Sequence, residues 1–330
     1  MHKLVRALAA GGAAVALTVS LAACGGTVAD PGAGSGSGGE GGGAEISVDT
    51  ARGPVTLPKP AAKVVSLEWV YTEELMSLGV TPVGVADSKS YASWLTAEGT
   101  ALPEGIQDVG KRQEPSLEQI KALAPDLIVA SEDRVKSNYE ALKGIAPVMS
   151  FDYTVKPQLE TMKKNFTALG AAVGKQEKAA EVLGQLDAKA ADVKARLEQA
   201  GKGGAEYAIG QAFTAQGAPS VRMLGNEAIA PQILGLAGLR NTWQGQQDAW
   251  GMTTVGVEGL SQVPATASFV YVAQAQDDPF SGALAGNPLW LNLPFVKDGR
   301  TAALDPGTWI FGGPASAMKL LDETAKALQV

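Results

Sequence analysis

The most regular pattern of apolar and polar positions in the chain lies between residues 175 and 200. Apolar side chains recur there at alternating steps of four and three residues: Ala179, Leu183, Leu186, Ala190, Val193 and Leu197. This spacing forms one apolar stripe on a helix, and Lys, Glu and Asp fill the other faces. Glycines stand before and after the stretch. We therefore predict a single helix, roughly 39 Å long over 175–200 at about 1.5 Å per residue, in an inter-lobe helix segment 175–203.

Short apolar runs alternate with helical patterns on both sides of this helix. In the first half, apolar runs occupy 64–67, 82–86, 127–130 and 148–151. In the second half, strands are predicted at 207–213 and 269–273, and helices at 226–239, from 257 and over 315–328. Such alternation predicts an α/β fold whose sheets are mainly parallel and flanked by helices. We predict two lobes, 45–174 and 204–330, joined by the long rigid helix; a helix lying along one domain, or a short coiled coil, is the alternative.

Capping residues indicate where helices begin in the first lobe. Thr72 is placed to cap one helix, with Glu73 and Glu74 in its first turn, and Ser116 forms a capping box with Gln119. In parallel α/β folds, ligands bind beyond the carboxyl ends of the strands. The loops at 68–69, 87–98 and 131–134 are therefore expected at the working edge.

The first 44 residues have the composition of a targeting segment and a tether. Lys3 and Arg6 precede an apolar run over 7–19, and Leu21-Ala22-Ala23-Cys24-Gly25 follows. This order resembles a bacterial lipoprotein signal over 1–24, which implies a lipid on Cys24 and a location on the extracytoplasmic face of the cell membrane. An ordinary secretory signal containing a cysteine is the alternative. Residues 25–44 are mostly Gly, Ser and Ala and are predicted to be a flexible tether.

Composition restricts the chemistry that the chain can perform. The net charge of −7 argues against nucleic acid as a partner. His2 and Cys24 are the only histidine and cysteine in the sequence, and both lie in the predicted signal. Catalytic triads and histidine-rich metal sites are therefore excluded from the mature chain. The 34 acidic residues leave a paired-carboxylate glycosidase open, although no pair stands out.

Several segments resemble a known family of binding proteins. They are Leu67-Glu68-Trp69, the run 78–87 with Tyr91 and Trp94, the run 108–118, Pro125-Asp126-Leu127, the run 241–245, Ala249-Trp250-Gly251, the run 287–290 and Trp309. In this order they resemble the ferric-hydroxamate (ferrichrome-type) siderophore-binding proteins of ATP-driven importers, from about residue 62 to the end. The resemblance implies a class III periplasmic-binding-protein-like fold, two lobes joined by one long helix. It also implies a non-catalytic protein without a cofactor, in which iron is bound only as the ferric siderophore.

The resemblance also implies which residues contact the ligand. A ferric trihydroxamate needs aromatic faces and a few fixed donors. Trp94, Trp250 and Trp309 match aromatic positions of the family's cleft, and Arg112 matches an arginine that points at the hydroxamate oxygens. Each tryptophan could instead belong to the core, and Arg112 could pair with Glu114 on the surface. Trp69 and Tyr91 are further cleft candidates.

Arg134 departs from the family pattern. The resemblance implies a tyrosine soon after the 127–130 strand, and an ungapped count from Arg112 places Arg134 there. Arg134 could donate to the same oxygens or be solvated, and Tyr139 could take the tyrosine's place. This departure leaves the identity of the siderophore open.

Two acidic residues are candidates for docking to a partner. In the resembling proteins one glutamate on each lobe docks onto the permease of an ABC importer, and Glu118 and Glu258 lie in similar sequence contexts. Each also falls in the first turn of a predicted helix, where the helix dipole favours an acidic residue without a partner. We further expect a monomer.

The sequence as a whole predicts a membrane-anchored solute-binding protein that captures ferric siderophores, of hydroxamate type, for iron uptake. The same fold could instead carry cobalamin, haem or ferric citrate. Ferric citrate is anionic and would require several arginines in the cleft. An anchored carbohydrate-active enzyme and an adhesive lipoprotein, in which the tryptophans would be buried, are the alternatives from other classes.

Overall fold

Residues 45–330 are described by the computed structural model of the protein, and they form one compact unit. The predicted signal peptide, Cys24 and the 25–44 tether lie outside the described residues. Within 45–330, none of the helices combines the length and the apolar composition that a membrane crossing requires. The helices are α1 (Trp69–Ser77), α2 (Ser88–Trp94), α3 (Leu117–Ala122), α4 (Glu132–Val135), α5 (Tyr139–Lys143), α6 (Gln158–Ala172), α7 (Gln176–Gln199), α8 (Ile229–Leu236), α9 (Pro288–Leu291), α10 (Pro294–Lys297) and α11 (Pro314–Ala327), with 3₁₀ turns η1 (Val257–Gln262) and η2 (Ala275–Asp277).

The sheet of the first half is fully parallel, as predicted. Its strands are β3 (Val64–Ser66), β4 (Gly84–Val85), β5 (Leu127–Ser131) and β6 (Val148–Phe151), in the order β4-β3-β5-β6. Val65 pairs with both Gly84 and Ile128, so β3 lies in the interior of the sheet. All residues of these four strands are buried, which explains their continuous apolar sequence. A separate antiparallel hairpin, β1 (Ile46–Thr50) and β2 (Gly53–Leu57), precedes this sheet.

The sheet of the second half is mixed rather than mainly parallel. It consists of β7 (Glu206–Ala215), β8 (Ala218–Leu224), β9 (Arg240–Asn241), β10 (Met252–Val255), β11 (Ser268–Val272) and β12 (Thr301–Ala303). β7 runs parallel to β9 and β11, and β11 runs parallel to β12, but β8 is antiparallel to β7 and β10. A two-residue turn, Gln216 and Gly217, joins β7 to β8, with both residues at positive φ. Such tight hairpin turns match the twist of the strands that they join.

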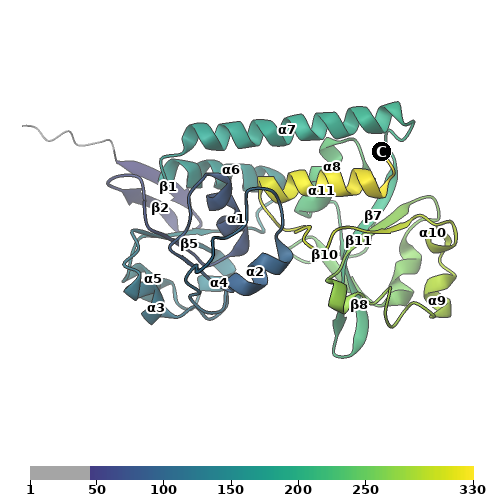
Figure 1. The fold of residues 1–330 in the computed structure, drawn as a ribbon, viewed down its shortest axis with the longest axis horizontal. Helices are drawn as coiled ribbons and strands as arrows, with labels where there is room; N and C mark the ends of the chain where they lie inside the picture. The colour runs from purple at the N-terminus through teal and green to yellow at the C-terminus, as the bar shows by residue number, and fades with distance from the viewer. Residues whose placement is uncertain (1–44) are drawn as a thin grey trace, which may run out of the picture. The chain divides into compact units, whose positions relative to one another are not determined.

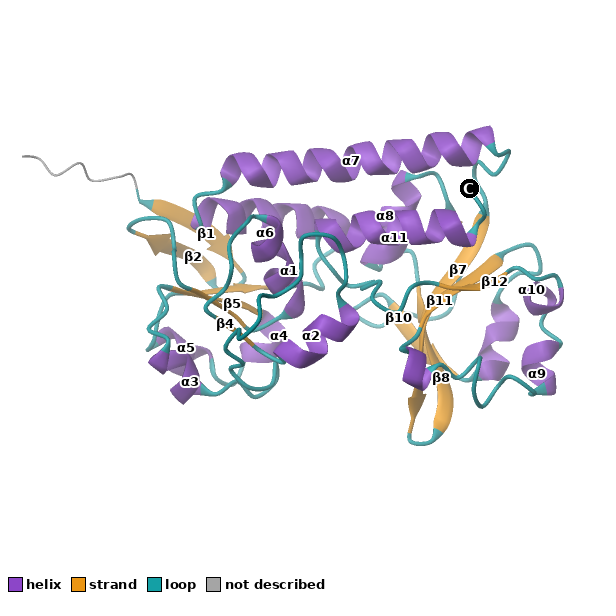
Figure 2. Ribbon diagram, in the orientation of Figure 1, coloured by secondary structure: helices purple, strands orange, loops and turns teal. Residues whose placement is uncertain are grey.

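Helix α7 is the predicted long helix, and it connects the two halves while packing on both. It contacts α6, which precedes it in the chain, and α8 and α11, which follow it (Figures 1 and 2). Its buried face consists of Ala179, Val182, Leu186, Ala190, Val193 and Leu197. Leu183, which was predicted on this face, is only partly buried, because Val182 takes the position that faces the neighbouring helices.

One hydrophobic core continues through both halves beneath α7. It contains Leu75 and Phe166 from the first half, and Ile233 and Leu320 from the second. Each half has a further cluster of its own on the far side of its sheet, around Ile128 in the first and Phe269 in the second. The two halves are therefore joined by shared apolar packing as well as by a connecting helix.

Helix α1 begins earlier than predicted, and this changes the role of its glutamates. Its N-cap is Glu68, whose carboxylate accepts a hydrogen bond from the Trp69 backbone N–H at 2.9 Å. Thr72, predicted as the cap, is a buried residue inside the helix. Glu73 and Glu74 thus leave the first turn and face the protein interior, where both are fully buried.

Glu73 caps the amino terminus of α11, a helix more than 240 residues further along the chain. Its carboxylate accepts from the Ser316 N–H at 2.6 Å, the Ser316 hydroxyl at 2.7 Å and the Gly313 N–H at 3.1 Å. Gly313, the residue at the N-cap position of α11, has no side chain for this task. Burial raises the pKa of Glu73, and these hydrogen bonds oppose the rise. Glu73 therefore ties α1 of the first half to the last helix of the chain.

Glu74, the next residue, offers a test of how a buried acid affects stability. Neither of its carboxyl oxygens has a hydrogen-bond partner among the described residues. Burial, together with the charge of Glu73, raises its pKa well above the usual range. A pKa raised in the folded state contributes stability that is full below about pH 4.5, the pKa of an unfolded glutamate, and that is lost as the pH rises toward the folded pKa.

Glu74→Met is therefore expected to raise the free energy of unfolding at pH 8 by roughly 1–3 kcal/mol, because it removes an unpaired buried acid. The gain should shrink toward pH 4.5, because the carboxyl is then protonated in the folded state and about half protonated in the unfolded state. Urea unfolding at the two pH values measures the difference, with Glu140→Met on the exposed side of α5 as the control. An equal gain at both pH values would show that Glu74 does not titrate in this range.

Candidate functional site

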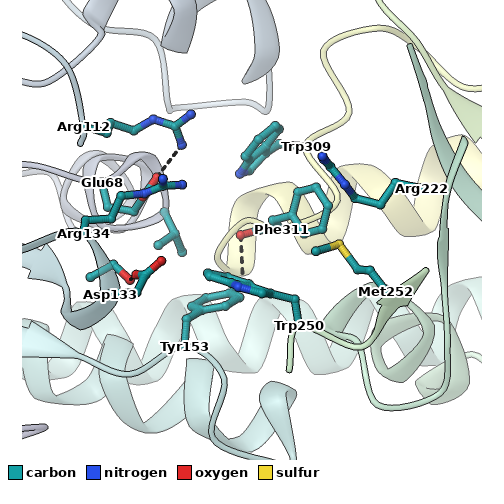
Figure 3. Close-up of a pocket in the computed structure, with 12 residues that line it drawn as sticks. Glu68, Arg112, Asp133, Arg134, Tyr153, Arg222, Trp250, Met252, Trp309 and Phe311 are labelled. Carbon is teal, nitrogen blue, oxygen red and sulfur yellow. Dashed lines mark hydrogen bonds and ion pairs between the residues drawn. The ribbon is translucent and has the colours of Figure 1, made fainter. Parts of the chain in front are cut away.

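A cavity of about 370 Å³ lies between the two halves at the carboxyl edge of the first sheet. The first half contributes residues that follow β3, β5 and β6, which is the edge predicted from the sequence. The lining consists of Glu68, Val70, Arg112, Ser131, Asp133, Arg134 and Tyr153 from the first half, and Arg222, Trp250, Met252, Trp309 and Phe311 from the second (Figure 3). The seven residues of the first half form a mainly polar wall of the cavity, and the five residues of the second half form a largely aromatic wall.

Glu68 organises the polar wall. One carboxylate oxygen accepts from Arg112 Nη1 at 2.7 Å, and the other accepts from Arg134 Nε at 2.7 Å. Figure 3 shows the two guanidinium groups meeting at this carboxylate. A single acid thereby fixes two arginines, each of which keeps further N–H donors for a ligand.

Contacts with Trp69 and Asp87 also hold Arg112 in place. Its guanidinium carbon lies 3.6 Å from the centroid of the Trp69 ring, a close cation–π contact. Its backbone N–H donates to Asp87 at 3.0 Å, and that carboxylate also pairs with Lys111 at 2.9 Å. The Arg112 side chain is therefore preorganised rather than free in solvent.

The aromatic wall is built from loops that follow strands of the second half. Trp250 stacks on Tyr153 of the first half, with ring centroids 5.7 Å apart, and the Tyr153 hydroxyl donates to the Phe311 carbonyl at 2.9 Å. Trp309 contacts Phe311 edge-on at 5.2 Å. These contacts bring side chains from both halves together at the cavity, as Figure 3 shows for the labelled residues.

The structure brings four of the predicted ligand residues to the cavity and places the others elsewhere. Arg112, Arg134, Trp250 and Trp309 line it. Trp69 is buried beneath Arg112, and Trp94 packs edge-on against Trp309 with centroids 5.7 Å apart, so both support lining residues.

Two tyrosines lie away from the cavity. Tyr91 is fully buried, and its hydroxyl donates to the Thr100 carbonyl at 2.8 Å. Tyr139 lies under Arg52, whose guanidinium carbon is 4.1 Å from the ring centroid, so it does not replace Arg134. Arg134 itself faces the cavity.

Six lining residues that matter for its chemistry were not among the predicted ligand residues, although Glu68 and Asp133 lie in loops that were expected at the working edge. They are Glu68, Asp133, Tyr153, Arg222, Met252 and Phe311. Three carried a usable signal, because Glu68, Asp133 and Tyr153 each lie two residues after the end of a buried strand of a parallel sheet. Arg222 lies on a strand that was not predicted, and no signal pointed to it.

The candidate docking residues are both exposed. Glu118 lies in the first turn of α3, and Glu258 lies in the first turn of η1. Over residues 45–330, neither carboxylate takes part in an ion pair. In the same range, no three His, Cys, Asp or Glu side chains are grouped so that they could hold a metal ion.

Comparison of the sequence with known protein families shows to which family the chain belongs. A model of the family described as "Periplasmic binding protein" matches residues 64–308, which include the strands of both sheets and ten of the twelve residues that line the cavity. This chain belongs to the periplasmic binding protein family. The family consists of extracytoplasmic substrate-binding proteins and is not a family of enzymes.

Individual members of this periplasmic binding protein family show extensive similarity. The iron(3+)-hydroxamate-binding protein FhuD of Escherichia coli (strain K12) is 31% identical over 257 residues, which are 78% of this chain and 83% of that protein. The Fe(3+) dicitrate-binding periplasmic protein FecB of the same organism is 29% identical over 287 residues, 85% of this chain and 89% of that protein.

A solved structure of another member has the same fold. The siderophore-binding protein FhuD of Vibrio cholerae, bound to Fe³⁺–Desferal, superposes with a TM-score of 0.72 at 26% identity, over 81% of this chain and 97% of that one. The resemblance inferred from the sequence, and the predicted α/β fold of two lobes joined by a long helix, are thus confirmed.

Proposed function

We propose that this protein captures a ferric siderophore of hydroxamate type outside the cytoplasm and delivers it to an ABC importer for iron uptake. The observation that carries this proposal is the cavity between the halves, where Glu68 fixes Arg112 and Arg134 opposite the aromatic faces of Trp250 and Trp309. The names of the FhuD relatives, which bind iron(3+)-hydroxamates, support the same ligand class.

The geometry suggests how such a complex is held. The free N–H groups of Arg112 and Arg134 donate to the chelating oxygens, which carry partial negative charge. The Trp250 and Trp309 rings contact the apolar arms of the chelator. Iron is then bound only within its chelator, the protein provides no cofactor of its own, and the ligand is released unchanged, so the protein is not an enzyme.

Closure of the two halves around the ligand is proposed to be limited. The shared core beneath α7 and the Glu73 cap on α11 would both have to deform in a large hinge motion. Packed interiors resist such continuous deformation. Capture then depends on a cavity that is largely formed before the ligand arrives.

Delivery is proposed to use a lipid anchor and two docking glutamates. The Leu21-Ala22-Ala23-Cys24 segment supports lipid attachment at Cys24, which keeps the protein, as a monomer, at the membrane. Exposed Glu118 and Glu258 are available to contact arginines of the permease. Rim charges of this kind set the encounter rate and the orientation more than the affinity.

Ferric citrate is a second candidate ligand, because three arginines line the cavity. Arg222 joins Arg112 and Arg134 there. A citrate complex is anionic and requires such groups, and the FecB relative is named for dicitrate.

Titration of tryptophan fluorescence with coloured chelates tests the proposed function. Ferrichrome, ferrioxamine B, a ferric catecholate, ferric citrate and cobalamin are added separately to the purified protein, and a free tryptophan amide measured in parallel corrects for absorption by the ligand. We expect saturable quenching by at least one hydroxamate, because Trp250 and Trp309 line the cavity. If only citrate or cobalamin saturates the signal, the hydroxamate assignment is wrong. If none of them does, the protein is not a binding protein for these chelates.

A further inference from the structure

The formal charges of the polar wall cancel. Arg112 and Arg134 share Glu68, and Asp133 supplies a second negative charge to the cavity lining. Asp133 accepts a hydrogen bond from the Ser131 hydroxyl. Behind this wall, Asp87 is balanced by Lys111. The first half's wall of the cavity therefore presents oriented donors but no net formal charge, which suits the neutral centre of a ferric trihydroxamate.

Arg222, on the opposite wall, has no carboxylate within ion-pair distance in the described part of the chain. It lies on β8, between β7 and β10, and its Nη1 donates to the Gln211 side-chain oxygen at 2.7 Å. Its guanidinium carbon is 5.1 Å from the Phe213 ring centroid. Among residues 45–330 it forms no ion pair within 4.0 Å. Figure 3 shows its side chain on the cavity side, near Phe311 and Met252.

The carboxylate of Asp248 acts on Arg222 by its charge, and one of its oxygens, Oδ1, is engaged by backbone donors. Asp248 accepts from the backbone N–H groups of Trp250 and Met252, at 2.9 Å and 3.0 Å, and so shapes the loop that carries both lining residues. Burial lowers the pKa of Arg222 from its usual value, and Asp248 only partly opposes this. A half-buried cation without an anionic partner is costly, and a negative group brought by a ligand would reduce that cost.

We propose that Arg222 selects ferric chelates that carry one anionic group, such as a carboxylate, pointing toward the second half of the cavity. This inference rests on the proposed function and specifies its ligand. Arg112 and Arg134 hold the chelated iron centre on one wall, and Arg222 binds the anionic arm across the cavity, beside Phe311 and Met252. The formal charge of the five charged lining residues is +1, which matches a single negative charge better than the several charges of a citrate complex.

A series of ligands with one chelating core separates charge from shape. Ferrioxamine B ends in an ammonium group, its N-acetyl derivative is neutral there, and its N-succinyl derivative ends in a carboxylate. Each is titrated against the wild-type protein by fluorescence quenching. We expect the succinyl complex to bind about tenfold more tightly than the acetyl complex, and ferrioxamine B to bind most weakly. The preference should decrease between 50 and 500 mM salt.

Arginine variants assign the preference to one side chain. Arg222→Gln is expected to bring the ratio of the succinyl and acetyl dissociation constants close to one, whereas Arg222→Lys should retain part of the preference. Arg240→Gln is the matched control, because it removes the same charge from the same sheet at an exposed residue that pairs with Glu206 outside the cavity. This control should keep the wild-type ratio, which excludes an effect of net charge alone.

The outcomes distinguish selection of an anionic ligand by Arg222 from siderophore binding itself. If the wild-type protein binds all three complexes equally, Arg222 does not select an anionic ligand, while siderophore binding stands. The same conclusion follows if Arg222→Gln keeps the tenfold preference. If none of the three complexes binds while ferrichrome does, the inference fails and hydroxamate binding stands; if ferrichrome does not bind either, both fail. Should Arg222→Gln not fold, as shown by its melting curve, the wild-type ratio and the Arg222→Lys variant still decide.

Discussion

Replacing Arg112 by alanine is expected to weaken binding of a ferric hydroxamate by about 100-fold. The guanidinium can donate two charge-assisted hydrogen bonds to the ligand, each worth roughly 1.5–3 kcal/mol. Its position is fixed by Glu68, at 2.7 Å, and by the Trp69 ring beneath it. Because the side chain is held in place before binding, little of this energy is lost in ordering it. Fluorescence titration of wild type and variant with the same chelate measures the ratio.

Arg52→Ala provides a matched control for this variant. Arg52 also belongs to the first half, pairs with a glutamate, Glu132, at 2.7 Å and lies over an aromatic ring, but it is not part of the cavity lining. Its loss should leave the affinity within about threefold of wild type. A loss of similar size in both variants would mean that Arg112 acts through the stability of the first half and does not contact the ligand.

Glu73→Ala is expected to lower the free energy of unfolding by about 4 kcal/mol, which corresponds to a fall in Tm of roughly 10 °C. The carboxylate is fully buried, and its removal leaves the Gly313 and Ser316 N–H groups at the start of α11 without an acceptor. Thermal unfolding followed by circular dichroism measures the shift.

Two further variants show whether the cap is the cause. Ser316→Ala removes only the hydroxyl bond to Glu73 and should cost about a third as much. Glu181→Ala, on the exposed face of α7, should leave the melting temperature close to that of wild type. If Glu73→Ala has the same melting temperature as the Glu181→Ala control, the three hydrogen bonds contribute little net stability. The association of α1 with α11 then depends on apolar packing.

Local patterns were sufficient for much of the fold and part of the site. The apolar stripe of α7 and the buried strands of the first sheet follow from periodicity and composition, because these properties depend on neighbours within a few residues. The family resemblance brought Arg112, Trp250 and Trp309 into consideration, and the structure places all three on the cavity.

The features that could not be predicted depend on contacts between distant residues. Threonine is a favoured N-cap and glutamate is not, so the local sequence predicts Thr72 as the cap of this helix. Glu68 takes that position because its carboxylate also accepts from Arg112 and Arg134, which lie 44 and 66 residues further along the chain. Tyr153 reaches the cavity through its stacking on Trp250, a contact between the two halves.

The second sheet was harder to predict for a related reason. Strand β8 runs over Ala218–Leu224, where the alternation is short: after Pro219, only Val221 and Met223 alternate with polar Ser220 and Arg222. It becomes a strand because β7 and β10 pair with it on either side. Because β8 was not predicted, neither the β7–β8 hairpin nor the position of Arg222 on the cavity wall could be predicted.

The tie between Glu73 and α11 also bears on the order in which the chain can fold. Helix α1 belongs to the first quarter of the sequence, and α11 is its last helix. Until α11 has been synthesised and has packed, Glu73 has no donors from Ser316 or Gly313, and the core beneath α7 lacks Leu320 and Leu321. Proteins with independent domains often complete the amino-terminal one during synthesis. In this chain the sheet of the first half can form early, but its core is fully packed only after the carboxyl-terminal helix α11 has folded against it.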